Sequence, residues 1–115
     1  MKKKFVTAAS LQRQYQRLCA TLVHTGYVSQ GSVLDRSTLR PPRSGYQWTR
    51  KAARKTITVA LSLEQFEALR QAIENRRRLQ RTIGTMETLS RQILFATMPD
   101  TRHRKPLPKR VLGLI

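Results

Sequence analysis

The residues around Ser62 carry the local signal that most constrains the fold of this chain, because they specify where a helix begins. Ser62 suits the N-cap position, and Gln65 follows three residues later, which completes a capping box. Leu61 and Phe66 occupy the two positions of a hydrophobic staple across the same start. Helix-compatible sequence continues until Pro99, so the sequence predicts one long helix over residues 62–97.

An interrupted apolar seam runs along this predicted helix at alternating four- and three-residue spacing. Its apolar members are Ala72, Leu79, Ile83, Met86 and Ile93. Arg76 and Ser90 fall on the same seam, so the pattern is coiled-coil-like but too broken for a long zipper. We expect the seam to pack against the first helix of the chain, near its N-terminus. Gly84 lies in mid-helix and is a candidate for a kink or for the close approach of another backbone.

Two strand-like runs, residues 46–51 and 55–61, lead directly into the long helix. Side chains in a strand alternate between faces, so the first run places Tyr46, Trp48 and Arg50 together. The second run places Ile57, Val59 and Leu61 on one face. Residues 52–54 are predicted as the tip of a β-hairpin, although they lack the Asn-Gly or Asp-Gly signal of a tight turn. Residues 33–39 are a candidate for a third short strand.

An amphipathic pattern near the N-terminus predicts a first helix over residues 7–25. Its apolar stripe consists of Leu11, Tyr15, Leu18 and Leu22. Gly26 then suits a left-handed helix cap. The fold class is therefore α+β: one domain over residues 7–98, with strands within 31–61 forming a hairpin or a three-stranded sheet, packed with two helices of which the second is long. A basic arm at residues 1–6 and a basic tail at residues 99–115 are expected to be flexible.

The charge of the chain points to a polyanionic partner. Its 115 residues include 23 Lys and Arg but only 6 Asp and Glu, which gives a formal charge of +17. Such charge repels itself unless an anion such as nucleic acid neutralises it. A membrane partner is disfavoured because no helix combines a purely basic face with a bulky apolar one. The single cysteine, Cys19, allows no intramolecular disulfide and no cysteine-based zinc site within one chain, which fits the cytoplasm.

The candidate nucleic-acid-binding residues fall in three places on the sequence. They are Arg50, Lys51, Arg54 and Lys55 at the hairpin tip, Arg77, Arg78 and Arg81 on the long helix, and Arg102, Arg104 and Lys105 in the tail. Tyr46 and Trp48 are candidates for stacking on bases. The alternative, that both rings belong to the core, is favoured in a chain with so few aromatic residues.

The acidic and nucleophilic residues form no pattern that could run a reaction. Acid–base catalysis needs paired groups in tuned environments. Glu67 and Glu74 lie two helical turns apart, but no histidine or cysteine joins them. Glycine-rich phosphate-binding loops are absent from the sequence. We therefore expect a protein that is not an enzyme, with no cofactor, no bound metal and no small-molecule substrate.

Several short motifs resemble a family of small, basic, uncharacterised bacterial proteins that are often encoded near transposases. The shared features are a Gly-Ser pair at residues 31–32, a Tyr-x-Trp-Thr-x-Lys strand at 46–51, and an E-N-x-R-x-L stretch at 74–79. The resemblance covers roughly residues 31–94. Residues 37–43 stand where the family has a cysteine cluster, so any metal role of that turn is absent from this chain. The resemblance implies the same architecture and a mobile-element setting, and it carries no activity.

The sequence thus favours a non-enzymatic accessory protein of a mobile genetic element, which binds DNA or RNA through phosphates. The alternative is an assembly subunit, either a homodimer or the partner of a transposase or recombinase, with no direct role in binding nucleic acid. The small expected core, the interrupted seam and the apolar residues 111–115 favour that alternative.

Overall fold

The computed structural model of the protein describes residues 6–115, so most of the predicted basic arm (residues 1–5) lies outside the described part. The chain divides into two compact units. The sheet unit contains residues 25–79, and the helical unit contains residues 6–24 together with residues 80–115. The long helix α2, Leu63–Thr97, contributes its first half to the sheet unit and its second half to the helical unit.

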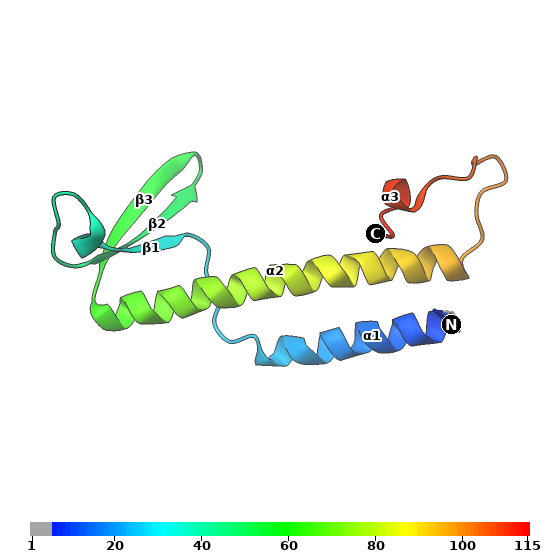
Figure 1. Cartoon of the computed structure of the whole chain (residues 1–115), viewed down its shortest axis with the longest axis horizontal. Helices are drawn as coiled ribbons and strands as arrows, with labels where there is room; N and C mark the ends of the chain where they lie inside the picture. The colour runs from blue at the N-terminus through cyan, green and yellow to red at the C-terminus, as the bar shows by residue number, and fades with distance from the viewer. Residues whose placement is uncertain (1–5) are drawn as a thin grey trace, which may run out of the picture. The chain divides into compact units, whose positions relative to one another are not determined.

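A three-stranded antiparallel sheet of order β1-β2-β3 forms most of the sheet unit (Figure 1). The strands are β1, Ser32–Asp35, β2, Tyr46–Ala52, and β3, Lys55–Leu61. A short 3-10 helix, η2, at Arg36–Thr38, follows β1. In register, β1 pairs with β2 only as far as Thr49, whereas β2 and β3 pair along their whole length to Ala52 and Lys55. The predicted third strand is therefore present, but it ends at Asp35 because residues 36–38 of the predicted 33–39 form η2; the α+β fold class is confirmed.

The predicted start of the long helix is confirmed in its detailed hydrogen bonding. The Ser62 amide donates to Oε1 of Gln65 over 3.0 Å, and the Gln65 amide donates to Oγ of Ser62 over 3.1 Å. This reciprocal pair satisfies two amides that a helix start would otherwise leave without partners. The helix then runs without interruption to Thr97, the residue at which the prediction ended it.

The sheet unit is held together by contacts between α2 and the segments that face it. The rings of Tyr46 and Phe66 lie 4.6 Å apart, centroid to centroid. The backbone amide of Ser29 donates to the carbonyl of Ala72 over 3.2 Å, which fixes the segment before β1 on the helix. Ala72 and Ile73 are buried at this contact. The hairpin thus contacts α2 at the end where Tyr46 lies, and the segment before β1 is bonded to the same helix.

Three helical segments and the second half of α2 form the helical unit. They are α1, Ala8–Thr21, the 3-10 turn η1, Leu22–His24, and α3, Lys109–Leu112. Thr7 caps α1 by accepting a hydrogen bond from the Ser10 amide over 3.1 Å. Within this unit α1 runs antiparallel to the second half of α2 (Figure 1). The predicted helix over residues 7–25 is thus an α-helix that tightens into a 3-10 turn over its last residues.

The last residues of the chain, within the tail that the sequence predicted to be flexible, include a short helix. They form α3, which ends at Gly113 in a left-handed conformation with φ of 72°. Arg91 Nε donates to the Gly113 carbonyl and Gln92 Nε2 donates to the Leu114 carbonyl, both over 2.7 Å. Two side chains of α2 therefore hold the segment after α3 through its backbone carbonyls. Because these contacts are polar, the apolar pattern of the sequence does not predict them.

Burial is sparse throughout residues 6–115. The buried residues there are Ala72, Ile73, Leu89 and Asn75, and no side chain in the described part is fully enclosed. Gly84 does not mark a close approach, because a Cβ atom built there meets no described atom within 4 Å. A small protein with so little buried surface has modest stability, so single polar contacts weigh heavily in it.

Candidate nucleic-acid interface

The turn between β2 and β3 brings four cations together at one end of the hairpin. Ala53 and Arg54 form a two-residue turn with φ of 49° and 66°, the positive φ values that a type I′ turn requires. This turn sets Ala52 opposite Lys55 and Lys51 opposite Thr56. We call Arg50, Lys51, Arg54 and Lys55 the tip cations. The four cations that the sequence predicted at the tip therefore lie at the same end of the folded hairpin.

Little on the hairpin offsets this charge. Residues 46–61 include no Asp or Glu. Lys51, Arg54 and Lys55 are exposed, and their side chains make no hydrogen bond or ion pair with the described residues. Unit charges 4 Å apart interact by about 1 kcal/mol in water and by about 4 kcal/mol near a protein surface. A bound anion would relieve this repulsion, and the hairpin itself provides none.

Arg50 differs from the other tip cations because it is half-buried. Its guanidinium lies over the ring of Trp48, 5.3 Å from the ring centroid. Arg50 and Trp48 share the face of β2 that also carries Tyr46, whereas Lys51 lies on the opposite face. The cation–π contact holds the Arg50 side chain along the hairpin rather than beyond its tip.

Tyr46 and Trp48 make the contacts of packing residues. Tyr46 stacks at a tilt of 32° against Phe66 of α2. Trp48 Nε1 donates to the Gln30 carbonyl over 3.0 Å. Gly31 approaches the indole so closely that a Cβ there would lie 2.5 Å from Nε1, so the glycine is required for this contact. These contacts favour the core interpretation of both rings over a stacking platform.

The candidate arginines of α2 fall into both units and are partly engaged. Arg77 pairs with Glu74 over 3.1 Å, and both side chains are more than half exposed. Arg78 donates to Oδ1 of Asn75 over 2.9 Å. Arg77 and Arg78 belong to the sheet unit, whereas Arg81 is an exposed residue of the helical unit. Exposed ion pairs contribute about 0–1 kcal/mol, so Arg77 can exchange its partner for a phosphate at small cost.

Asn75 organises the sheet unit next to these arginines, although the E-N-x-R-x-L stretch that contains it predicted no role for it. Only 8% of its surface is exposed. Its Nδ2 donates to the Tyr27 carbonyl and its Oδ1 accepts from Gln71 Nε2, both over 2.9 Å. Asparagine is a poor residue for a helix interior. Its presence in the middle of the predicted helix was therefore the one sequence feature that could have indicated a role in tertiary contacts.

The tail candidates lie in the helical unit. Arg104 forms an ion pair with Asp100, and its guanidinium also lies 5.3 Å from the ring centroid of Phe95. Arg102 and Lys105 are exposed. The Arg104 side chain is therefore held by contacts within the protein, whereas Arg102 and Lys105 make no such ion pair or ring contact with the described residues.

A carboxylate at the end of β1 has the one perturbed acidity that the described residues show. The hydroxyl and the backbone amide of Ser37 donate to Asp35 Oδ1 over 2.7 and 3.0 Å. These hydrogen bonds, led by the one from the hydroxyl, lower the pKa of Asp35. Asp35 thereby caps η2, which is a structural task.

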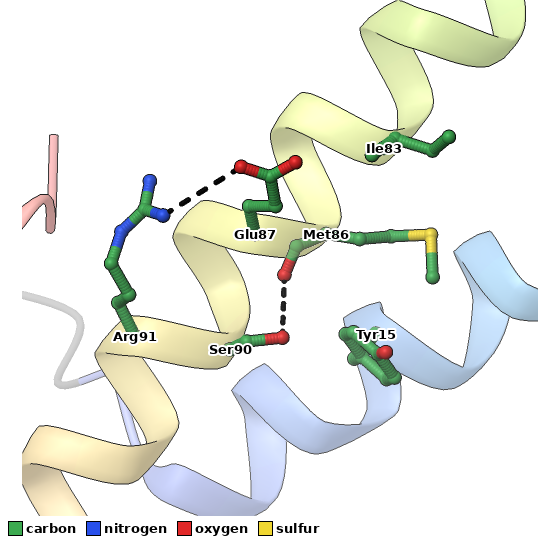
Figure 2. A pocket seen from close by; sticks show the side chains of 6 residues that line it. All are labelled: Tyr15, Ile83, Met86, Glu87, Ser90 and Arg91. Carbon is green, nitrogen blue, oxygen red and sulfur yellow. Dashed lines mark hydrogen bonds and ion pairs between the residues drawn. The ribbon is translucent and has the colours of Figure 1, made fainter.

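An open pocket of about 330 Å³ lies in the helical unit between α1 and α2 (Figure 2). Tyr15, Ile83 and Met86 give it apolar walls. Its polar side chains are already engaged, because Glu87 faces Arg91 over 3.8 Å and the Ser90 hydroxyl donates to the Met86 carbonyl over 2.8 Å (Figure 2). The pocket thus holds no nucleophile beside a base.

Neither metal chemistry nor a membrane span is indicated by residues 6–115. No group of three His, Cys, Asp or Glu among them could hold a metal ion. None of their helices is both long enough and apolar enough to cross a bilayer.

No protein-family model, no curated protein and no solved structure matches the chain. The family resemblance drawn from the sequence therefore stays a prediction. The candidate interface has to be judged by its own geometry and charge.

Proposed function

We propose that this protein binds nucleic acid without catalysing a reaction, and that the hairpin tip is its principal contact. The observation that carries the proposal is the set of four tip cations on a segment with no carboxylate. Lysine and arginine at the end of a β-ribbon can each replace a counterion at a phosphate. Contacts of this kind supply affinity with little dependence on base sequence.

Arg77 and Arg78 give the same unit a second group of cations on α2. Arg77 is the more available of the two, because among the described residues its side chain pairs with the exposed carboxylate of Glu74. Arg81, Arg102 and Lys105 would add contacts from the helical unit. The resemblance noted in the sequence suggests the setting, an accessory protein of a mobile genetic element.

Salt-dependent binding tests this proposal directly. Fluorescence anisotropy with labelled duplexes and single strands of about 20 nucleotides, between about 50 and 200 mM salt, should show affinity that falls steeply with salt. Replacing Arg54 and Lys55 together with alanine should weaken binding about tenfold or more and reduce the log–log salt slope by roughly two.

The matched control is the double replacement of Arg13 and Arg17 with alanine. These two exposed arginines lie on α1, and their loss lowers the net charge by the same amount. A control loss within about threefold assigns the effect to the tip rather than to total charge. The proposal fails if the wild-type protein binds no nucleic acid at low salt. Equal losses in both variants would remove the tip as the principal contact.

Sparse burial favours a second candidate, an assembly subunit that is a homodimer or the partner of a transposase or recombinase. Large apolar side chains stay exposed in both units, among them Tyr27 at 92% and Val23 at 79%. Contact with another chain would cover such residues. Sedimentation that shows a monomer at every concentration would rule out the homodimer, and binding that ignores salt would favour an apolar assembly.

A further inference from the structure

The two faces of the β2–β3 hairpin differ sharply in chemistry. Residues paired across antiparallel strands share a face. The face that packs toward α2 carries Tyr46, Trp48, Arg50, Ile57, Val59 and Leu61. The opposite face, here called the threonine face, carries the pairs Gln47–Ala60, Thr49–Thr58 and Lys51–Thr56.

The threonine face is open and its side chains can form hydrogen bonds. Lys51, Thr56 and Thr58 are exposed, and Thr49 is half-buried. The hydroxyl oxygens of Thr49 and Thr58 lie 3.4 Å apart across the two strands. Threonine both donates and accepts hydrogen bonds and presents a methyl group, and lysine donates. Because the threonines are short, the strands themselves could come close to a surface that these groups contact.

The end of the hairpin is a ribbon of two strands and no more. The pairing of β1 with β2 stops at Thr49, so residues 50–57 of the β2–β3 hairpin extend beyond β1 (Figure 1). Neighbouring strands lie about 4.8 Å apart. The major groove of B-form DNA, about 12 Å wide and 8.5 Å deep, admits a two-stranded ribbon. The major groove of A-form RNA is too narrow for side chains to read.

We propose that this free end of the hairpin enters the major groove of duplex DNA with its threonine face toward the bases. Lys51 and Thr56 would meet base edges first, and Thr49 and Thr58 would follow. Arg54 and Lys55, at the turn, would contact phosphates at the edge of the groove. This inference rests on the proposed nucleic-acid binding and deepens it by naming the ligand as duplex DNA and the groove as the major one.

The contacts on the other face set this orientation. Trp48 is fixed by its hydrogen bond to the Gln30 carbonyl, and Arg50 lies over its ring. Tyr46 packs on Phe66 of α2. The aromatic and arginine side chains of the face toward α2 are therefore engaged within their own unit, although Val59 on that face is exposed. The threonine face, whose Lys51, Thr56 and Thr58 are exposed, is the one with polar side chains available to a groove.

The test uses the full chain and duplexes of one sequence in three forms: DNA, DNA whose cytosines carry glucosylated 5-hydroxymethyl groups that fill the major groove, and RNA. We expect plain DNA to bind at least about tenfold more tightly than either other form, because only its major groove is open. The minor-groove ligand netropsin should change DNA binding by less than about twofold. Equal affinity for all three forms overturns the inference and leaves phosphate binding intact.

Paired valine variants test the threonine face itself. Thr56→Val/Thr58→Val removes two hydroxyl groups, and valine keeps the shape and the β-strand preference. Thr85→Val/Thr97→Val is the control, since both hydroxyls bond to carbonyls of their own helix. In selection from randomised DNA duplexes, wild type and control should enrich a shared base pattern of about three positions that the face variant loses. An unchanged pattern in the face variant, or no pattern in wild type, overturns base reading; absence of binding to any duplex removes the proposed function as well.

Discussion

Replacing Asn75 with alanine should lower the free energy of unfolding of the sheet unit, because this residue joins α2 to the segment before β1. The variant loses the bond from Nδ2 to the Tyr27 carbonyl, which is worth about 1–1.5 kcal/mol. Gln71 and Arg78 also lose their acceptor, but both side chains are exposed and can turn to water, at a cost of at most about 0.5 kcal/mol in total. Alanine is the better helix former by roughly 0.5 kcal/mol. The net loss should therefore be about 0.5–1.5 kcal/mol.

The assay can follow the sheet unit alone. Trp48 is the single tryptophan of the chain and belongs to that unit, so its fluorescence during urea denaturation reports on the unit. Far-UV circular dichroism follows the helices of both units. With a slope of about 1–2 kcal/mol per molar urea, the fluorescence midpoint should fall by roughly 0.3–1.5 M.

Gln71→Ala is the matched control, since it removes one bond to Asn75 and leaves the contact with Tyr27. Its midpoint should shift by less than about 0.3 M. The reasoning is refuted if Asn75→Ala shifts the midpoint no more than Gln71→Ala does. A shift seen in circular dichroism but absent from Trp48 fluorescence would also contradict it.

Three further predictions concern single contacts or single positions. Ser62→Ala and Gln65→Ala should each cost about 1 kcal/mol, and the double variant should cost less than the sum in thermal unfolding because the two bonds are reciprocal. Gly84→Ala should raise the free energy of unfolding by about 1 kcal/mol, since the position is in mid-helix with open space around it; a loss of stability would contradict that placement. The lowered pKa of Asp35 means that its contribution to stability is present above the ordinary carboxyl pKa and is lost as pH falls through the lower folded value. Ser37→Ala should therefore raise the pKa of Asp35 in an NMR titration and make the acid-induced loss of stability smaller; an unmoved pKa would exclude Ser37 as the cause.

The parts of the fold that the sequence predicted are those set by contacts between near neighbours. The start of α2 depends on residues within one helical turn, so Ser62 and Gln65 predicted it together with its hydrogen bonds. Alternation likewise predicted β2 and β3 because one face of the hairpin packs on a helix. The Ala53–Arg54 turn formed without the usual residues, because the strands on either side determine its length.

The parts that the sequence left open depend on polar contacts between residues far apart in the chain. Asn75 meets the Tyr27 carbonyl across 48 positions, and Arg91 meets the Gly113 carbonyl across 22. Every residue has a backbone carbonyl, so no sequence pattern predicts which carbonyl will accept a hydrogen bond from a distant side chain. The sequence was enough to name the tip cations. Assigning each of them to one face of the hairpin required the pairing register of β2 and β3, which the sequence does not give.

The Ala53–Arg54 turn has a consequence for anyone who engineers this protein. Both residues hold left-handed backbone conformations, which cost a residue other than glycine or asparagine roughly 1 kcal/mol. A screen for thermal stability alone would therefore enrich glycine at position 54. The same substitution deletes one of the tip cations, so variants that tolerate heat best should be those that hold nucleic acid least well. A directed-evolution experiment would meet this trade-off between stability and binding first at Arg54.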